Sequence, residues 1–330
     1  MDLVIRTLFD FVFHTNLILY LLALAGAWAV LWWSIDNFRS IVQIAISVLT
    51  PYFQPHKKKT LVERYGEWAV ITGATDGIGK QYSKELASQG LNILLISRTK
   101  KKLVEVAQEI ESTYPVKTKY IVADFGHGQA IYDNIKQQMQ LLDVGILINN
   151  VGRMYDFPDE LANIPEDLLW QIMNINVGSV MMMSRIVIPQ MKEKKRGIIV
   201  NVSSGSECQP APLMAVYGAT KVFVKNFTLA INKELEEYNV QAQLVTPMFV
   251  LTKMNNYSTS VMKGSILVPD VESYTKSAVF TLGKSSKTTG YWSHGVQYGC
   301  MKLVPEFIRT HLMFGINKVF RQEYHDQQKP

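Results

Sequence analysis

The sequence predicts an α/β fold, a doubly wound parallel sheet, with an N-terminal transmembrane helix. Six short apolar runs alternate with amphipathic helical patterns between residues 68 and 246. A glycine-rich turn, TGATDGIG at residues 72–79, follows the first run, and residues 15–35 contain no charged side chain. Strands that alternate with helices form βαβ units, and right-handed βαβ crossovers produce a parallel sheet.

The chain of 330 residues is long enough for one large α/β domain with appendages. Its 48% hydrophobic residues and net charge of +6 favour contact with a membrane or with a phosphorylated cofactor. Nucleic-acid binding is not expected, because the sequence has no basic recognition helix and no aromatic RNA-binding motif. The two cysteines form no CxxC pair and the six histidines lack metal-ligand spacing, so neither a disulfide framework nor a metal site is predicted.

Residues 15–35 are 21 uncharged residues, which as a helix extend roughly 30 Å, about the thickness of a bilayer core. Trp28, Trp32 and Trp33 gather toward one end, as residues of a membrane interface do. A signal peptide cleaved near Ala25 and a buried helix of a soluble protein are the two alternatives. The apolar run continues past Ala25, which favours a membrane anchor.

The anchor and its linker are expected to occupy residues 1–60, the α/β domain residues 61–300, and a C-terminal amphipathic helix and tail residues 301–330. A second apolar stretch, residues 40–53, is too short to span a membrane and is predicted to lie at its surface or to re-enter it. The basic residues 56–59 either place the following domain on the cytosolic side or belong to a solvated linker. Residues 303–320 form either a packed helix, the favoured interpretation, or a helix lying on the membrane.

Six strands are predicted in the domain, and the segments between them have helical spacing. Ile78, Tyr82 and Leu86 repeat every four residues, and Gly90 ends that helix. The predicted strands are residues 68–72, 91–97, 118–123, 144–148, 197–203 and 240–246.

The glycine-rich turn lies between the first strand and the first helix, as in a Rossmann-type dinucleotide site. Gly73 permits the tight turn, Gly77 lets the backbone approach a pyrophosphate, and Gly79 lets helix and strand pack closely. The N–H groups at the helix start favour phosphate binding. The turn residues predicted to contact the cofactor are Gly73, Thr75, Asp76, Gly77, Ile78 and Gly79.

The end of the second strand predicts which dinucleotide binds. NAD sites usually have an acidic residue there, which binds the ribose 2′-hydroxyl. Here the strand ends with Ser97 and Arg98, and Lys100 to Lys102 follow. A guanidinium binds a 2′-phosphate in bidentate fashion, so Arg98 predicts NADP(H).

Tyr217 and Lys221, four residues apart, are predicted to lie on one helix face and to carry the chemistry. Reduction of a carbonyl needs a proton at its oxygen, and a free tyrosine is a poor acid–base group near neutrality. A neighbouring ammonium and an oxidised nicotinamide ring lower the tyrosine pKa. Ser204, at the end of the fifth strand, is placed to polarise the carbonyl, and Asn176 to hold a water that relays protons to the lysine.

Together these motifs resemble those of the classical short-chain dehydrogenases over residues 68–298. The TGxxxGxG turn matches, as does NNVG at residues 149–152, with Val for the usual Ala, and the tetrad matches at Asn176, Ser204, Tyr217 and Lys221. The resemblance implies that Asp124 contacts the adenine, that Asn150 belongs to the cofactor site, that Tyr217 and Lys221 contact the nicotinamide ribose, and that Thr252 contacts the carboxamide. It also implies homodimers formed through helices near Tyr217.

Within that family the chain is similar to the membrane-bound 17β-hydroxysteroid dehydrogenases and 3-oxoacyl-CoA reductases, through YGEWAV at residues 65–70, SSGS at 203–206 and TTGYWSH at 288–294. The resemblance implies a protein of the endoplasmic reticulum membrane that reduces 17-ketosteroid or 3-oxoacyl-CoA substrates. A mitochondrial location is the alternative, because the C-terminus lacks a dilysine retrieval pattern.

Two departures bear on activity. A related hydroxysteroid dehydrogenase-like branch replaces the catalytic tyrosine with Phe and is regarded as inactive. A nucleotide-binding scaffold is therefore the alternative function, although this sequence keeps Tyr217. Many family members have Pro-Gly where this chain has Pro247 and Met248. Residues 253–268 are expected to form an apolar lid that suits a sterol or an acyl chain.

Overall fold

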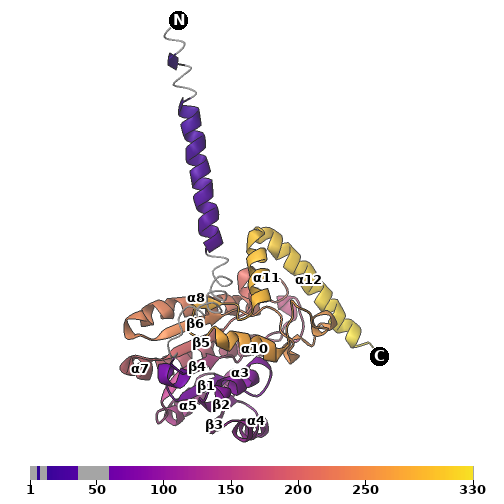
Figure 1. Cartoon of the computed structure of the whole chain (residues 1–330). Helices are drawn as coiled ribbons and strands as arrows, with labels where there is room; N and C mark the ends of the chain where they lie inside the picture. Colours follow the sequence, from indigo (N-terminus) through magenta and orange to yellow (C-terminus); the bar gives the residue numbers. More distant parts are fainter. Residues whose placement is uncertain (1–5, 8–12, 36–58, 330) are drawn as a thin grey trace.

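The computed structural model describes residues 6–7, 13–35 and 59–329 (Figure 1). It confirms the predicted α/β architecture: one parallel sheet has helices on both faces, and a long N-terminal helix projects from the domain. The strands are β1 Trp68–Thr72, β2 Asn92–Ser97, β3 Thr118–Val122, β4 Val144–Asn149, β5 Ile198–Val202, β6 Gln241–Val245 and β7 Lys287–Thr288.

The strand order β3-β2-β1-β4-β5-β6-β7 makes the sheet doubly wound. β1 lies between β2 and β4, so the direction of the crossovers reverses there, and Ile71 of β1 is paired with Ile148 of β4. In sheets of this type ligands bind beyond the carboxyl ends of the strands at the reversal point. The turn after β1 and the segment after β4 therefore mark the expected site.

Each predicted strand is present, and β1 has the predicted bounds. The other five differ from the predictions by one residue at one or both ends. The seventh strand, β7, was not predicted. It contains two residues, too few for an apolar pattern, and it exists because Leu244 and Val245 of β6 pair with it in parallel.

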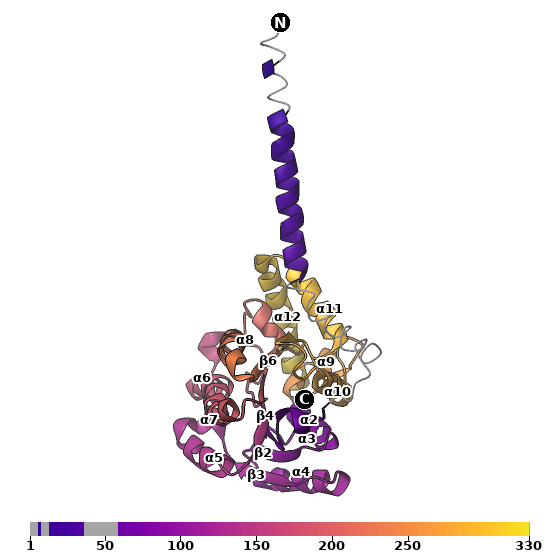
Figure 2. The ribbon, with the colours of Figure 1, turned by 60° about the vertical axis from the view of Figure 1, so that its left-hand side comes forward.

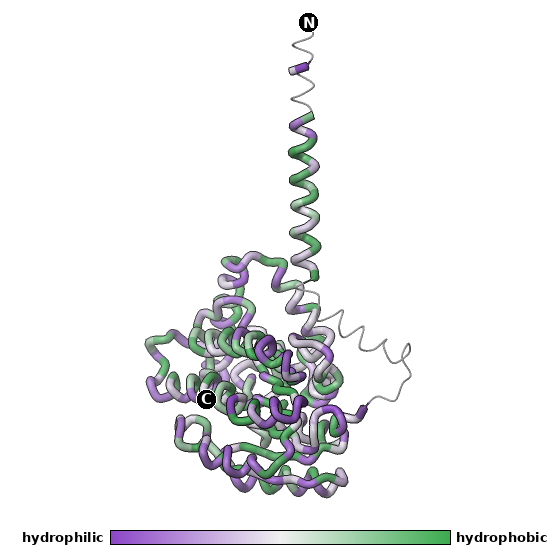
Figure 3. The backbone as a smooth tube through the Cα atoms, turned by 90° about the vertical axis from the view of Figure 1, so that its left-hand side faces the viewer, coloured by the Kyte–Doolittle hydropathy of each residue, from purple (hydrophilic) through white to green (hydrophobic). Residues whose placement is uncertain are grey.

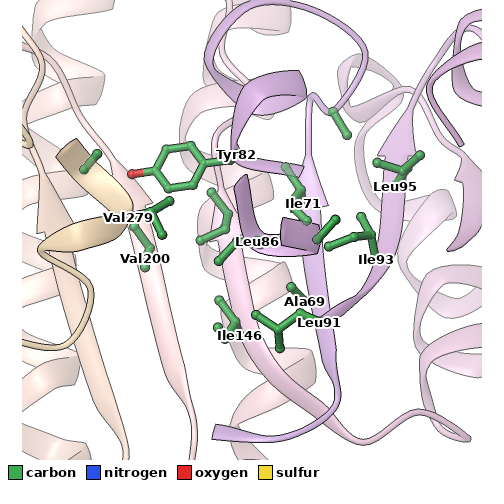
Figure 4. Close-up of a cluster of buried hydrophobic side chains, with 14 of the residues drawn as sticks. Ala69, Ile71, Tyr82, Leu86, Leu91, Ile93, Leu95, Ile146, Val200 and Val279 are labelled. Atoms are coloured by element: carbon green, nitrogen blue, oxygen red, sulfur yellow. The ribbon is translucent and has the colours of Figure 1, made fainter. Parts of the chain in front are cut away.

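Helices cover the sheet in two layers, and each layer buries one face of the strands. Tyr82 and Leu86 of helix α3 pack against Ile71 and Ile93 of the sheet (Figure 4). Removing such apolar area from water contributes about 25 cal/mol per Å². One face is covered by α3 Gly77–Ser88, α4 Lys100–Thr113 and α10 Val271–Phe280, and the other by α5 Tyr132–Met139, α7 Ser179–Lys194 and α8 Ala215–Leu235.

The last two helices, α11 Trp292–Leu303 and α12 Glu306–Gln327, form what we call the cap. Asn317 and Phe320 of α12 are buried, and the Phe320 ring lies 5.8 Å from the ring of Phe249 between centroids. The predicted boundary between residues 300 and 301 falls inside α11. Shorter elements are α2 Leu61–Tyr65, α6 Glu166–Met173, the π-helical turn Asn174–Gly178 and α9 Thr259–Met262.

The N-terminal helix Phe13–Ile35 is long and apolar enough to cross a membrane, with a mean hydropathy of 1.9 and no part of its apolar window buried. It stands apart from the domain as a green, hydrophobic rod in Figure 3. Glu166–Lys194 meets the same criteria of length and composition, but 44% of its window is buried inside the domain. The expected surface segment at residues 40–53, and residues 56–58 of the basic cluster, lie outside the described residues.

Candidate active site

The turn after β1 needs glycine for two separate reasons. Gly73 and Gly77 have φ angles of 66° and 50°, in the left-handed region that glycine adopts without a steric cost. A Cβ atom on Gly79 would clash with the Gly73 carbonyl oxygen and the Asn150 side chain. Helix α3 therefore begins in direct contact with the turn and with Asn150 after β4.

Asn150 holds this turn against the end of β4. Its backbone N–H donates to Thr72 Oγ1 at 3.0 Å, and its side-chain Nδ2 donates to the Thr72 carbonyl at 3.1 Å. Asn149, one residue earlier, donates to Asn201 of β5 at 2.8 Å. The two asparagines thus tie together the ends of the three central strands, which explains why the NNVG sequence follows β4.

Asp76, predicted among the cofactor contacts, is the N-cap of α3. Its carboxylate accepts from the Gly77 N–H at 2.8 Å and pairs with Lys253 Nζ at 2.7 Å. Burial alone would raise the pKa of Asp76, but the hydrogen bonds from Lys253 and Gly77 hold it below its ordinary value. Both side chains of the ion pair are at least half exposed, so the pair contributes little stability and separates easily.

The ends of β2 and β3 carry the residues predicted to select the dinucleotide. Ser97 is hydrogen-bonded to Thr75 of the turn at 2.9 Å. Arg98 is exposed, and within the described part of the chain its guanidinium has no hydrogen-bond or ion-pair partner. Asp124, after β3, accepts from the Gly126 N–H at 2.9 Å. Arg98 is therefore available for an anionic ligand group.

Helix α8 places Tyr217 and Lys221 one turn apart, and both side chains are buried. Lys221 Nζ lies 5.7 Å from the centroid of the Tyr217 ring and donates to the Val202 carbonyl at 3.1 Å. Ser204 is the second residue after β5, and its Oγ accepts from the Ser206 N–H at 3.3 Å. The structure thus brings Ser204, Tyr217 and Lys221 together at the carboxyl end of β5.

The acidity of Tyr217 differs from the expectation. Burial raises the pKa of Tyr217 above its ordinary value, and the neighbouring Ser204 and Ser206 hydroxyls only partly offset this. Burial also lowers the pKa of Lys221 to about 8, against the opposing influence of Glu207. In the protein alone, desolvation therefore disfavours the charged forms of both Tyr217 and Lys221.

Asn176 lies in the π-helical turn between α6 and α7. Its Oδ1 accepts from the Arg153 N–H at 2.8 Å, and its Nδ2 donates to the Arg153 carbonyl at 2.8 Å and to Thr220 Oγ1 at 3.0 Å. A Cβ atom on Gly152 would lie 3.8 Å from Asn176 Oδ1 and 3.9 Å from Lys221 Nζ. The asparagine and the lysine therefore border the same small space, which suits a bridging water.

A cavity of about 180 Å³ opens at these side chains. Ser204, Tyr217 and Lys221 line it together with three of the predicted cofactor contacts, and the rest of the wall is mainly apolar and rich in methionine. The wall includes Ile78, Asn150, Thr252, Met154, Met214, Met248, Phe249, Met254, Tyr257, Met301 and Met313. An open depression of about 440 Å³ between α4 and β3 contains none of the predicted site residues.

Glu207 was not predicted from the sequence. This buried carboxyl group accepts hydrogen bonds from Ser203 and, at 3.2 Å, from Thr246, and Tyr298 of the cap donates to it at 3.4 Å. Burial raises the pKa of Glu207. No motif indicates this group, because two of its partners, Thr246 and Tyr298, come from distant segments.

His294 supports the segment after β6, where Pro247 and Met248 depart from the family pattern. Its Nδ1 accepts from the Met248 N–H at 3.2 Å, so the other ring nitrogen carries the proton and donates to the Phe249 carbonyl. Burial lowers the pKa of His294 to about 4. The Met248 sulfur fills the space that a side chain on Gly205 would occupy, so the structure accommodates the departure.

The comparisons agree with this geometry. The family model for short chain dehydrogenase matches residues 67–263. The human inactive hydroxysteroid dehydrogenase-like protein 1 is 41% identical over 92% of this chain and 91% of its own length. The human very-long-chain 3-oxoacyl-CoA reductase is 40% identical over 78% of this chain and 82% of its own length.

Two solved structures share the fold. A 7β-hydroxysteroid dehydrogenase superposes with a TM-score of 0.69 at 27% identity, over 77% of this chain and 99% of its own. A metagenomic short-chain oxidoreductase in complex with NADP has a TM-score of 0.52 at 28% identity, over 56% of this chain and 81% of its own.

The glycine turn at the reversal point of a parallel sheet and the Tyr-Lys pair beside it are features of dinucleotide-dependent oxidoreductases. The chain belongs to the short-chain dehydrogenase family.

Proposed function

We propose that the protein is an active NADP(H)-dependent reductase of a lipophilic ketone, held on a membrane by the helix Phe13–Ile35. One observation carries this proposal: Ser204, Tyr217 and Lys221 line a single apolar cavity that also reaches Ile78 and Thr252 beside the glycine turn. A carbonyl in this cavity would meet hydroxyl donors on one side and a bound dinucleotide on the other.

The residues present fit NADP(H). The left-handed Gly77 and the start of α3 offer backbone amides to a pyrophosphate. Arg98, whose guanidinium has no partner among the described residues, offers it to a 2′-phosphate. Asp124 is expected near the adenine and Thr252 near the carboxamide. When bound, NADPH supplies the hydride that is delivered to the carbonyl carbon.

The four side chains of the tetrad then have different roles in the reduction. Ser204 donates a hydrogen bond to the carbonyl oxygen and orients it, and Tyr217 gives its phenolic proton to that oxygen. Lys221 replenishes the proton and binds the ribose, and Asn176 holds the water between the lysine and solvent. Since burial raises the pKa of Tyr217, the phenolate that proton transfer leaves behind needs a positive charge nearby, which Lys221 and an oxidised nicotinamide ring would supply.

The cavity suits a bulky apolar substrate, of the 17-ketosteroid or 3-oxoacyl-CoA type. Its volume of about 180 Å³ is smaller than the ~300–1,000 Å³ usual for ligand pockets, so the wall must rearrange. Methionine side chains adapt readily to different shapes.

We place the protein in the endoplasmic reticulum membrane with a cytosolic domain, and a mitochondrial membrane is the alternative. A homodimer through α8 is part of the proposal, and α8 exposes Val222 and Phe223.

The second candidate function is a nucleotide-binding scaffold without turnover. It is favoured by the relative at 41% identity whose name includes the word inactive. It is disfavoured by the full set of Ser204, Tyr217 and Lys221 at one cavity.

The Tyr217→Phe variant tests the two functions. In a reductase this change removes the proton donor and leaves the dinucleotide site in place, so turnover of steroid and 3-oxoacyl-CoA ketones with NADPH falls at least ~100-fold while NADPH binding persists. Turnover is measured by NADPH oxidation and binding by fluorescence, both on detergent-solubilised protein. Tyr257→Phe, in the same cavity, is the matched control and retains most activity. If the natural protein binds NADPH and reduces neither ketone, the scaffold function is the correct one.

A further inference from the structure

The two cap helices have apolar groups on both of their sides. Their inner sides line the cavity through Met301 of α11 and Met313 of α12, and Asn317 of α12 donates to the Pro212 carbonyl at 2.7 Å. The cap is therefore held firmly as one wall of the cavity. An ordinary surface helix would have polar residues on the opposite side.

Large apolar side chains of the cap are nevertheless exposed. We call Trp292, Val296, Leu303, Phe307, Ile308 and Leu312 the cap outer surface. Leu303, Phe307 and Leu312 are 60%, 68% and 57% exposed, and residues 292, 296 and 303 follow one stripe of α11. Large contiguous apolar patches on proteins usually mark a contact with a partner or with a membrane.

The position of this surface favours a lipid bilayer as its occupant. Figures 1 and 2 both place the lower end of the helix Phe13–Ile35 at the same end of the domain as α11 and α12. The cap is thus at the end of the domain nearest the proposed anchor. Lys318 of α12 is exposed, and its ammonium group lies 4.2 Å from the centroid of the exposed Phe314 ring. Apolar residues bordered by lysines are typical of helices that lie in the interface of anionic membranes.

We propose that the cap outer surface lies in the boundary between headgroups and acyl chains of the membrane, so that α11 and α12 separate the lipid from the cavity. A ketone dissolved in the bilayer then reaches Tyr217 through the cap and does not cross water. The route of the substrate rests on the proposed function, whereas the lipid contact does not depend on it.

Lipid contact is tested on the full chain in vesicles that contain phosphatidylserine and phosphatidylcholine with brominated acyl chains. Cys300, which is exposed, is first changed to Ser, and Phe307→Cys or Leu312→Cys is labelled with a small fluorophore. We expect bromine to quench both labels several-fold more than a label at Leu141→Cys, which is 92% exposed in the segment between α5 and β4. Equal quenching at all three sites would overturn the proposal. Self-quenching of the labels in vesicles without bromine, if it disappears when labelled protein is diluted with unlabelled protein, would show a second copy as the occupant and would also overturn the proposal.

Substrate entry is tested with the double variant Phe307→Asp and Leu312→Asp. The KM of a membrane-partitioned ketone should rise roughly tenfold, while the kinetics with a short water-soluble ketone and the affinity for NADPH stay unchanged. An unchanged KM for the partitioned ketone would overturn the entry route. If the unmodified protein reduces neither ketone, the proposed function fails, and the quenching experiment still decides the lipid contact.

Discussion

At the scale of single residues, the site depends on a few groups whose charge is set by their surroundings. Arg98 is exposed and available, Tyr217 and Lys221 are buried and disfavoured as ions, and His294 is buried and neutral. The sequence placed Tyr217 and Lys221 on one helix, as the structure has them, and placed Arg98 at the end of the second strand, one residue beyond the observed end of β2. It could not indicate that burial outweighs the hydrogen bonds of Ser204 and Ser206 with Tyr217, because desolvation depends on atoms from distant segments.

Arg98→Glu tests the choice of dinucleotide. The substitution removes a bidentate partner of the 2′-phosphate, worth about 1.5–3 kcal/mol, so the Kd of NADPH should rise roughly ten- to hundredfold. The Kd of NADH, which lacks that phosphate, should change little. Lys101→Glu makes the same change of charge at the exposed start of α4 and should affect NADPH far less. A similar loss in both variants would mean that only the general positive potential matters. Both constants are measured by fluorescence titration.

His294 gives the fold a defined sensitivity to acid. Its pKa is about 4 in the folded protein and 6.5 ordinarily, so the unfolded chain takes up a proton first as the pH falls. The stability linked to this group is complete above pH 6.5 and is lost as the pH falls from 6.5 to 4, a total of roughly 3 kcal/mol. His294→Gln keeps hydrogen-bonding groups but does not titrate. Between pH 7 and pH 4.5, the unfolding free energy measured in urea should fall by about 2 kcal/mol less in this variant than in the unmodified protein. Equal losses in the two proteins would contradict the neutral, buried state of His294.

At the scale of elements, local sequence and tertiary contact agree where the glycine turn meets α3. The TGATDGIG pattern predicts a strand, a turn and a helix, and the structure has β1 ending at Thr72 and α3 starting at Gly77. The pattern does not show that Asp76 pairs with Lys253, since that contact spans more than half of the chain.

Gly79→Ala tests the contact between the turn and α3. The added Cβ would collide with the Gly73 carbonyl, which belongs to the backbone and cannot move aside, so we expect a loss of roughly 2–4 kcal/mol and weaker NADPH binding. Gly315→Ala is the matched control in α12, where a Cβ would meet nothing within 4 Å. Helix propensity there predicts a change between zero and a gain of ~1 kcal/mol. Urea unfolding compares the two, and equal stabilities would show that the turn adjusts freely.

At the scale of the whole molecule, the sheet core determines whether the site exists at all. Leu95 of β2 is fully buried between the sheet and its helices. Leu95→Ala should cost about 2–5 kcal/mol of unfolding free energy, because the cavity it leaves collapses only in part. Leu141→Ala, at 92% exposure, should stay within ~0.5 kcal/mol of the unmodified protein. Thermal unfolding in detergent measures both, and a cost at Leu95 as small as at Leu141 would contradict the described core.

The sequence alone determined the features that rest on neighbouring residues: the alternation of strands and helices, the glycine turn, the i,i+4 spacing of Tyr217 and Lys221, and the apolar helix near the N-terminus. Periodicity and turn chemistry act over a few residues, so a linear pattern contains them. Only the tertiary structure decided the two-residue strand β7, the burial of Glu207 beneath Ser203, the neutral state of His294 and the two-sided cap. These features arise when segments distant in the sequence pack together and exclude water. The free-energy cost of burying a charged or polar side chain depends on that exclusion.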